Sequence, residues 1–154
     1  MTRPLILDTF ATHEFLAKLD DRCLLDLASG VRPFAVAAGG YLGRKGLSAN
    51  AFYLIQAGTV LVGDEQPDGE LAALMTIGTG GVVGWSWLIP PHKWHFTCKA
   101  ETPVQGLMFD AAWLRDRCEQ NHELGFHLLK ELLGAVAGRL VASREERAKV
   151  PQVV

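Results

Sequence analysis

The sequence contains no apolar run long enough to cross a lipid bilayer, and its first residues lack the basic and apolar regions of a signal peptide. Cysteine is also scarce. Cys23, Cys98 and Cys118 are odd in number and far apart, and no two of them form a Cys-x-x-Cys pair. This spacing argues against a disulfide framework and favours a reducing compartment. We therefore expect a cytoplasmic protein without a membrane partner.

The chain also lacks an excess of positive charge. Its 15 Lys and Arg residues are outnumbered by 17 Asp and Glu residues, which gives a formal net charge of -2 at pH 7. A protein that holds the phosphate backbone of nucleic acid needs a basic surface. We therefore expect no direct DNA binding.

Catalytic and metal-binding arrangements are equally scarce. No activated nucleophile and no paired carboxylates stand out. His92 and His95 lie three residues apart and could form a metal site with Cys98, but no third strong ligand lies between them, and the His-x-His of a cupin is missing. The sequence predicts no enzyme, no cofactor and no metal, and a cupin-like metalloenzyme remains an alternative.

What the sequence does have is enough apolar content, 49% of 154 residues, to build one domain over residues 1–154. Helical spacing covers about residues 12–30, with Thr12 as a candidate N-cap. Residues 31–110 contain short apolar runs separated by glycine, a texture typical of a small antiparallel roll or barrel. Pro67 and the pair Asp68-Gly69 predict a tight turn between two of its strands. The fold class is mainly β with flanking helices.

The segment 111–149 predicts two helices, capped by Asp110 and Asn121, the second reaching about Lys149. At ~1.5 Å per residue this second helix is about 42 Å long, more than a small roll can cover. Its apolar residues form two stripes, which predict two packing surfaces. We assign one stripe to a homodimer interface; the alternative is a helix packed only on its own domain. The dimer stripe is Phe126, Leu129, Leu133, Val136 and Leu140, and the second stripe is Leu124, Leu128, Leu132 and Ala135.

Two glycine-rich segments carry a resemblance to a known family. Residues 39–46 (GGYLGRKG) and 52–58 (FYLIQAG) resemble the cyclic-nucleotide-binding domain of Crp/Fnr-type regulators, and the order of elements is similar over about residues 12–148. The resemblance implies a double-stranded β-helix, a jelly-roll-like β-roll, with short N-terminal helices and a long C-terminal dimerisation helix. Similar glycine punctuation also occurs in other rolls, cupins included.

The resemblance also has implications for function. The family's transcription factors continue into a helix-turn-helix domain, whereas this sequence ends at Val154. We therefore expect a stand-alone, non-enzymatic sensory or regulatory module that signals through its dimer helix and acts on a protein partner. A structural protein-interaction module with an occluded pocket is the alternative.

The family's phosphate-binding cassette aligns with residues 84–88 (GWSWL) and 94–100 (WHFTCKA), and here the sequence departs from the pattern. Trp85 stands where the resemblance implies a glutamate for the ribose, and Trp94 where it implies an arginine for the phosphate. Tryptophan can replace neither the carboxylate nor the bidentate guanidinium. We therefore expect no binding of cAMP or cGMP in the usual manner.

The tryptophan cluster supports two interpretations. It forms either an aromatic pocket for a small flat anionic ligand beside Lys93, or a hydrophobic plug that fills the vacated pocket. The candidate ligand-binding residues are Gly84, Trp85, Ser86, Trp87, Leu88, Lys93, Trp94, His95 and Thr97.

Overall fold

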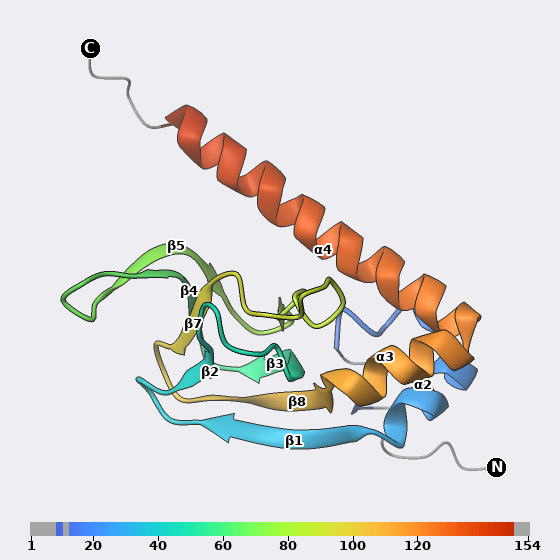
Figure 1. The fold of residues 1–154 in the computed structure, drawn as a ribbon. Helices are drawn as coiled ribbons and strands as arrows, with labels where there is room; N and C mark the ends of the chain where they lie inside the picture. Colours follow the sequence, from blue (N-terminus) through green and yellow to red (C-terminus); the bar gives the residue numbers. More distant parts are fainter. Residues whose placement is uncertain (1–8, 11–12, 150–154) are drawn as a thin grey trace.

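The computed structural model describes residues 9–10 and 13–149, with side chains up to Glu145. In these residues helix α2 (Asp21–Ala28) precedes eight strands, and α3 (Ala111–Gln120) and α4 (His122–Lys149) follow them (Figure 1). The strands are β1 (Val31–Val36), β2 (Tyr41–Gly43), β3 (Ala51–Ala57), β4 (Val60–Glu65), β5 (Leu71–Ile77), β6 (Val82–Val83), β7 (Thr97–Ala100) and β8 (Val104–Asp110).

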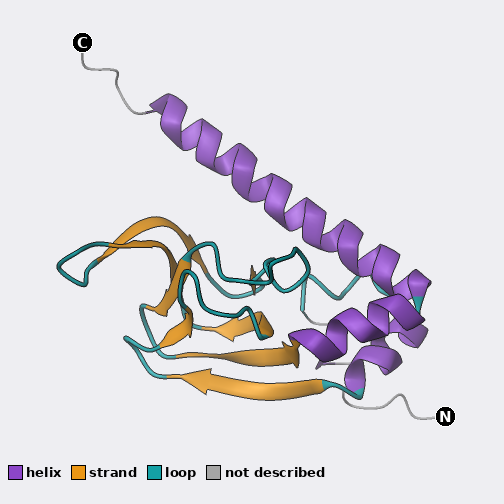
Figure 2. Cartoon of the chain, in the orientation of Figure 1, coloured by secondary structure: helices purple, strands orange, loops and turns teal. Residues whose placement is uncertain are grey.

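The described strands form two four-stranded antiparallel sheets, in the orders β1-β8-β3-β6 and β2-β7-β4-β5. Val31 faces Phe109 in the first sheet, and Val60 faces Ala100 in the second. The helices gather at one end of the roll, and α4 crosses above it (Figure 2). The expected mainly β fold, a β-roll with flanking helices, is confirmed.

The turn between β4 and β5 is the predicted hairpin. The N–H of Gln66 donates to the Glu70 carbonyl at 2.7 Å, and the N–H of Gly69 donates to the Gln66 carbonyl at 2.9 Å. Gly69 has a φ of +87°, which a residue without a Cβ adopts at little cost. The Asp-Gly pair therefore sets this turn as its sequence predicts.

Strand β3 explains why the roll has two apolar cores. Successive side chains of a strand point to opposite faces, so Phe52 and Leu54 enter the core beneath the helices, whereas Ile55 enters the interior of the roll. We call these the helix-side core and the roll interior. The roll interior consists of Leu42, Ala49, Ile55, Val60, Val62, Ile77, Val83, Trp94, Cys98, Ala100 and Val104.

The predicted N-caps of both C-terminal helices are confirmed. The Asp110 carboxylate accepts the N–H of Trp113 at 2.9 Å, and the Asn121 side-chain oxygen accepts the N–H of Leu124 at 3.1 Å. Each satisfies a backbone donor that the first turn leaves unpaired. Asn121 also donates to Asp26 at 2.9 Å, which ties the start of α4 to α2.

The N-terminal part differs from its sequence pattern. Residues 13–19 form a series of turns instead of a first helix, and the candidate cap Thr12 lies outside the described residues. So short a segment gains little from helix formation alone. Phe15, Leu16 and Leu19 are nevertheless buried in the helix-side core. The apolar spacing here therefore indicates burial and not a helix.

Helix α4 runs from His122 to Lys149, as predicted, and has one buried and one exposed apolar stripe. Leu124, Leu128 and Leu132 are at most 5% exposed and pack in the helix-side core. Leu133 and Leu140 are 70% and 71% exposed. Among the described helices, none combines the length and the apolar composition that a bilayer span requires.

Candidate functional site

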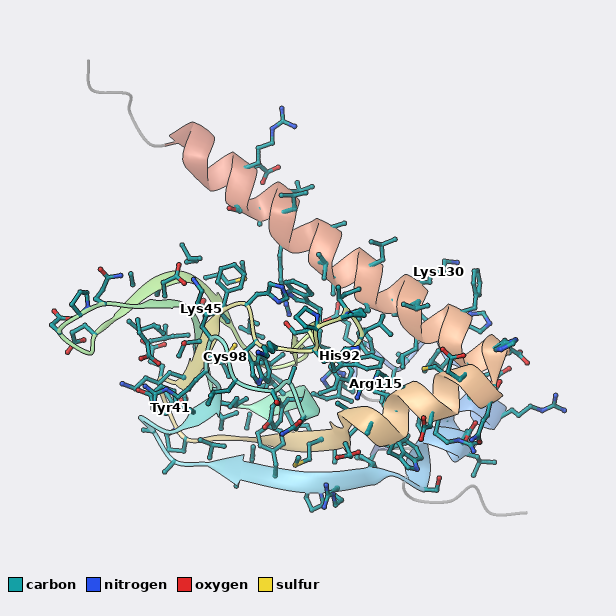
Figure 3. The ribbon with its side chains drawn as sticks, viewed as in Figure 1. Tyr41, Lys45, His92, Cys98, Arg115 and Lys130 are labelled. Carbon is teal, nitrogen blue, oxygen red and sulfur yellow. The ribbon has the colours of Figure 1, made fainter. Side chains whose placement is uncertain are left out.

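The segment that connects β6 to β7, residues 84–96, holds eight of the nine predicted ligand-binding residues and has no regular strand or helix. Backbone hydrogen bonds fix it to the loop after β2: the N–H of Trp94 donates to the Leu47 carbonyl at 2.9 Å. From the other side, Arg115 of α3, which is labelled in Figure 3, donates to the Trp87 carbonyl at 2.6 Å. The 84–96 segment is therefore held between the roll and the helices.

Trp94 fills the roll interior. Its side chain is 6% exposed and its ring stacks on Tyr53, with centroids 6.5 Å apart. It lies against two glycines: a Cβ at Gly43 would be 2.1 Å from Trp94 Cε2, and a Cβ at Gly84 would be 2.9 Å from Trp94 Cη2. Gly84 also has a φ of +101°. These glycines therefore make room for the indole ring at the position where the family pattern has its arginine.

Trp87 points to the opposite side of the segment and belongs to the helix-side core. It is 1% exposed, and its ring lies 5.6 Å from that of Phe52. Leu88 packs against the same core. In the described part of the chain, Trp87 Nε1 is buried without a hydrogen-bond partner. Trp87 is therefore a packing residue here.

Trp85 differs from the other two because it is only half-buried. It stacks on the exposed His95, with ring centroids 4.5 Å apart and planes 25° from parallel. Ser86 Oγ lies 3.0 Å from Nδ1 of His95, which fixes the orientation of the imidazole. Trp85 is therefore the member of the cluster that presents an aromatic surface outward.

Lys93 and Thr97 lie apart from this surface. Lys93 is exposed, and its backbone pairs with Ser48 in an isolated bridge. The buried Thr97 hydroxyl accepts the N–H of Lys45 at 3.1 Å and donates to Glu65 at 3.3 Å. Neither residue lines the small cavity that Gly84, Trp85, Ser86 and Trp94 share. The structure thus brings part of the predicted set together.

This cavity measures only about 30 Å³. It has room for ~two water molecules, whereas pockets for drug-sized ligands measure ~300–1,000 Å³. Besides residues of the roll, it is lined by Arg139 of α4. The cavity in which Gly84, Trp85, Ser86 and Trp94 meet therefore has no room for a ligand of nucleotide size.

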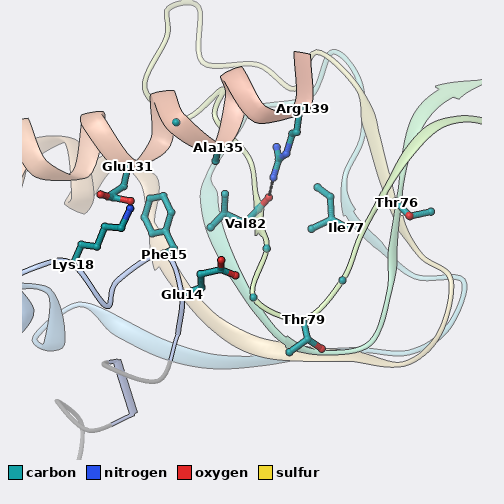
Figure 4. A pocket seen from close by; sticks show the side chains of 14 residues that line it. Glu14, Phe15, Lys18, Thr76, Ile77, Thr79, Val82, Glu131, Ala135 and Arg139 are labelled. Carbon is teal, nitrogen blue, oxygen red and sulfur yellow. Dashed lines mark hydrogen bonds between the residues drawn. The ribbon is translucent and has the colours of Figure 1, made fainter. Parts of the chain in front are cut away.

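Arg139 is the site residue that the sequence prediction missed. Its Nη2 donates to the carbonyl oxygen of Val82 in β6, as Figure 4 shows. Arg139 follows Leu132 and Ala135 at spacings of seven and four residues, so it continues the buried stripe of α4. A charged residue in a buried stripe is the signal that identifies it.

In the part of the chain that the structure describes, no carboxylate pairs with the charge of Arg139. Among the ion pairs of the described residues none involves Arg139. Burial lowers the pKa of the guanidinium below its usual value, and the neighbouring Cys98 thiol partly offsets this lowering. By contrast, the roll's Arg44 and Lys45 are paired with Glu65 and Asp64, at 2.9 and 3.1 Å.

Three larger depressions adjoin α4. One of about 590 Å³ lies between α4, the segment before β6 and the N-terminal turns; Arg139 lines it together with Glu14 and Glu131 (Figure 4). A second of about 230 Å³ is almost wholly apolar and runs from Trp85 and Leu88 to Leu133. The third, which we call the α4–β5 groove, measures about 530 Å³ and is lined by Val62, Ala73, Leu74, Met75, Trp85, Phe96, Val136, Arg139, Leu140 and Ser143.

The His92, His95 and Cys98 set suggested by sequence spacing is dispersed, since Cys98 is buried in the roll interior and His95 is exposed. The described residues contain one group with metal-ligand spacing, Asp20, Cys23 and Glu123, which lies at the helices rather than in the roll. Burial raises the pKa of the Cys23 thiol to about 12, which disfavours the thiolate that binds metal.

Comparison with protein families agrees with this architecture. Residues 33–121 match the family model described as the cyclic nucleotide-binding domain, which covers more than half of the chain. Among curated proteins, none matches the chain at a significant level.

Solved structures show the same fold. A putative cyclic nucleotide-binding protein from Geobacter metallireducens is 25% identical, with a TM-score of 0.79 over 91% of this chain and 99% of that one. A cyclic nucleotide-binding domain from Methylobacillus flagellatus is 18% identical, with a TM-score of 0.76 over 97% and 85%. The sensor domain of the transcriptional regulator DNR from Pseudomonas aeruginosa is 20% identical, with a TM-score of 0.66 over 96% and 94%.

Proposed function

Because this chain belongs to the cyclic nucleotide-binding domain family, we propose that it is a non-enzymatic regulatory module that works without a cyclic nucleotide bound in the usual manner. The observation that carries the proposal is the position of Trp94, which fills the roll interior against Gly43 and Gly84. A nucleotide cannot enter unless this ring, 6% exposed, moves out of the core. The loss of the two anchoring side chains would weaken binding further, by ~1.5–3 kcal/mol for each charged hydrogen bond.

The second part of the proposal is that α4 carries the signal, as a homodimer helix. Its predicted dimer residues Phe126, Leu133 and Leu140 are 63%, 70% and 71% exposed, and a contiguous apolar surface of this kind marks an interaction site. Arg139 connects the same helix to β6, directly before the 84–96 segment. A change in the conformation of the 84–96 segment would therefore alter how α4 packs on the roll. Dimerisation through α4 would in turn favour one conformation of the segment.

Hydrogen–deuterium exchange of residues 84–97 tests this coupling. Phe126→Glu is the appropriate dimer-breaking variant because Phe126 lines neither groove beside the segment. We expect the monomeric variant, identified by light scattering, to exchange faster or slower than the dimer across 84–97. The control is Val141→Glu, an exposed apolar position of α4 outside the dimer stripe.

An unchanged exchange pattern in a monomeric Phe126→Glu protein would contradict the coupling. It would favour the second candidate, a structural protein-interaction module whose pocket is permanently occluded. The specific observation for that candidate is again the buried Trp94. That either module acts on a protein partner stays a prediction, and so does the location of this protein in the cytoplasm.

A further inference from the structure

His13 is a buried histidine at the start of the N-terminal turns, residues 13–19. We propose that protonation of His13 at mildly acidic pH releases these turns from the helix-side core and exposes Phe15, Leu16 and Leu19. The inference goes beyond the proposed function, because such a release requires neither a ligand nor the dimer.

The first support is the state of the His13 ring. Its residue is 4% exposed, whereas His95 and His122 are exposed. Nδ1 accepts the N–H of Phe15 at 3.2 Å, so the neutral ring carries its proton on Nε2. In the described part of the chain, Nε2 is buried without a hydrogen-bond partner. This environment suits the neutral ring, with one nitrogen as an acceptor and the other away from water.

The second support is that the backbone of His13 holds the turns together. Its N–H donates to the Phe10 carbonyl at 3.0 Å. Its own carbonyl accepts the N–H groups of Leu16 and Ala17, each at 3.0 Å. With the contact from its side chain to Phe15, one residue connects most of this short segment. A change of charge at His13 therefore acts on the whole run of turns.

Protonation conflicts with the observed position of the ring. A protonated imidazole has an N–H on both nitrogens, so Nδ1 would meet the N–H of Phe15 donor to donor. The new charge would also be buried, which is costly unless a partner of opposite charge is present. The ring can satisfy both nitrogens by moving into water, and the turns that it anchors move with it.

The elements around His13 offer little compensation for that charge. Burial lowers the pKa of the imidazole below its ordinary value of 6.5, and this effect outweighs the backbone of Ile55 and Gly81 and the charge of Glu14, which raise the pKa. In β3 the titratable residue is Tyr53, which packs towards the roll interior. Residues 78–83, the segment that contains Gly81, include no titratable side chain.

The depression of about 590 Å³ beside the turns brings further charges near this segment (Figure 4). Lys18, Glu131 and Arg139 line it together with Glu14. The positive charges of Lys18 and Arg139 would not stabilise a second cation, and Glu14 is exposed to solvent, which screens its charge. The charged surroundings therefore do not cancel the cost of burial.

Release of the turns would change the surface of the molecule. Phe15, Leu16 and Leu19 are 6%, 1% and 6% exposed in the folded protein. Phe15 also lines the depression against α4. An acidic environment would thus replace a covered region by contiguous apolar surface, the kind of surface that marks interaction sites.

The direction of the pH effect follows from the two states of the ring. Released His13 binds its proton near pH 6.5, and the docked ring binds it only at lower pH. The docked segment is therefore fully stable above about pH 6.5 and becomes less stable as the pH falls. One proton limits the change in the opening equilibrium to ~tenfold per pH unit.

Hydrogen–deuterium exchange of the full chain at about pH 7.5 and about pH 5.5 tests the inference. The probes are the hydrogen-bonded amides of Leu16, Ala17 and Leu19. After correction for the intrinsic exchange rates, we expect their protection factors to fall by ~three- to tenfold at the lower pH. The amides of β3 and β8, which are central in their sheet, should change by less than ~twofold.

His13→Asn should remove this pH dependence, because the asparagine oxygen can accept the N–H of Phe15 in place of Nδ1 but does not titrate. His122→Asn, which replaces an exposed histidine of α4, is the matched control and should retain the pH dependence. Should His13→Asn not fold, NMR titration of the His13 ring in the unmodified protein decides the question. Its midpoint should lie below about pH 6.5 and coincide with the loss of protection.

The inference is overturned if the protection of residues 13–19 is the same at both pH values, or if His13→Asn loses it as the unmodified protein does. It is also overturned if β3 and β8 lose protection to the same extent, because the whole domain would then open. Binding of cAMP, which would contradict the proposed function, has no bearing on this result.

Discussion

Trp94 and Gly43 are in such close contact that a Cβ on the glycine would lie 2.1 Å from Cε2 of the indole. Gly43 ends strand β2, and Trp94 lies three residues before β7, the strand that pairs with β2. The absence of a side chain at position 43 thus creates the space that the indole occupies. Gly43 and Trp94, which are far apart in the sequence, therefore have complementary shapes.

Gly43→Ala is therefore expected to lower the free energy of unfolding by ~1–3 kcal/mol, as overpacked cores do. The change is measured by urea denaturation. Gly78→Ala is the matched control, because a Cβ there meets no atom within 4 Å and its effect should be small. If Gly43→Ala and the unmodified protein were equally stable, the described packing of the Trp94 ring against Gly43 would be contradicted.

Removal of the two indoles should have unequal effects. Trp94→Ala empties the roll interior and should cost ~3–5 kcal/mol, the range for large buried aromatic residues. Trp85→Ala should cost clearly less, since Trp85 is half-buried and its ring stacks on the exposed His95. Thermal and urea unfolding of the two variants provide the comparison. If the losses are similar, the distinction between the buried and the outward-facing tryptophan is wrong.

The dimer stripe predicts a change of mass. Leu133→Glu together with Leu140→Glu should convert a dimer to a monomer in light scattering, because two carboxylates would have to be buried in an apolar interface. Both positions are at least 70% exposed in the isolated chain, so the folded monomer should tolerate them. Val141→Glu, which introduces the same charge outside the stripe, should remain dimeric. A monomeric unmodified protein at high micromolar concentration would refute this part of the account.

The cysteines should be unreactive in the folded protein. Burial raises the pKa of the Cys23 and Cys98 thiols from 9.0 to about 12, and that of Cys118 to about 11. At pH 8 a thiol with a pKa near 12 is a thiolate in only ~one molecule in ten thousand. Ellman's reagent should therefore react slowly until urea is added. Fast reaction of all three thiols without urea would contradict their burial.

The same thiols give a direction for the pH dependence of stability. Since their pKa values are higher in the folded state, the unfolded chain loses its protons first. The stability that the neutral thiols provide is therefore complete below about pH 9 and declines as the pH rises above that value. Cys98→Ser should weaken this alkaline decline of the free energy of unfolding.

Much of the fold was predictable because local signals and the family pattern agree. The caps Asp110 and Asn121, the turn at Gly69 and the length of α4 depend on neighbouring residues in the chain, and the structure confirms each. The backbone conformation of residues 13–19 was not predictable. Apolar spacing predicts which side chains are buried, but here it does not predict that the backbone forms turns instead of a helix.

The candidate site was predictable only in part. The sequence identifies the departures at Trp85 and Trp94, but it does not show that one ring faces inward and the other outward. Arg139 is more than forty residues from the 84–96 segment and reaches it only because α4 folds back over the roll. Contacts of this kind depend on the packing of a helix against a sheet, which no local pattern encodes.

The central claim is that the protein's own side chains close the nucleotide pocket. Calorimetric titration of the full chain with cAMP and cGMP tests it most directly. The account predicts no saturable heat for either nucleotide in the micromolar range. Saturable binding of either one below about 10 µM, or about −7 kcal/mol, would contradict it.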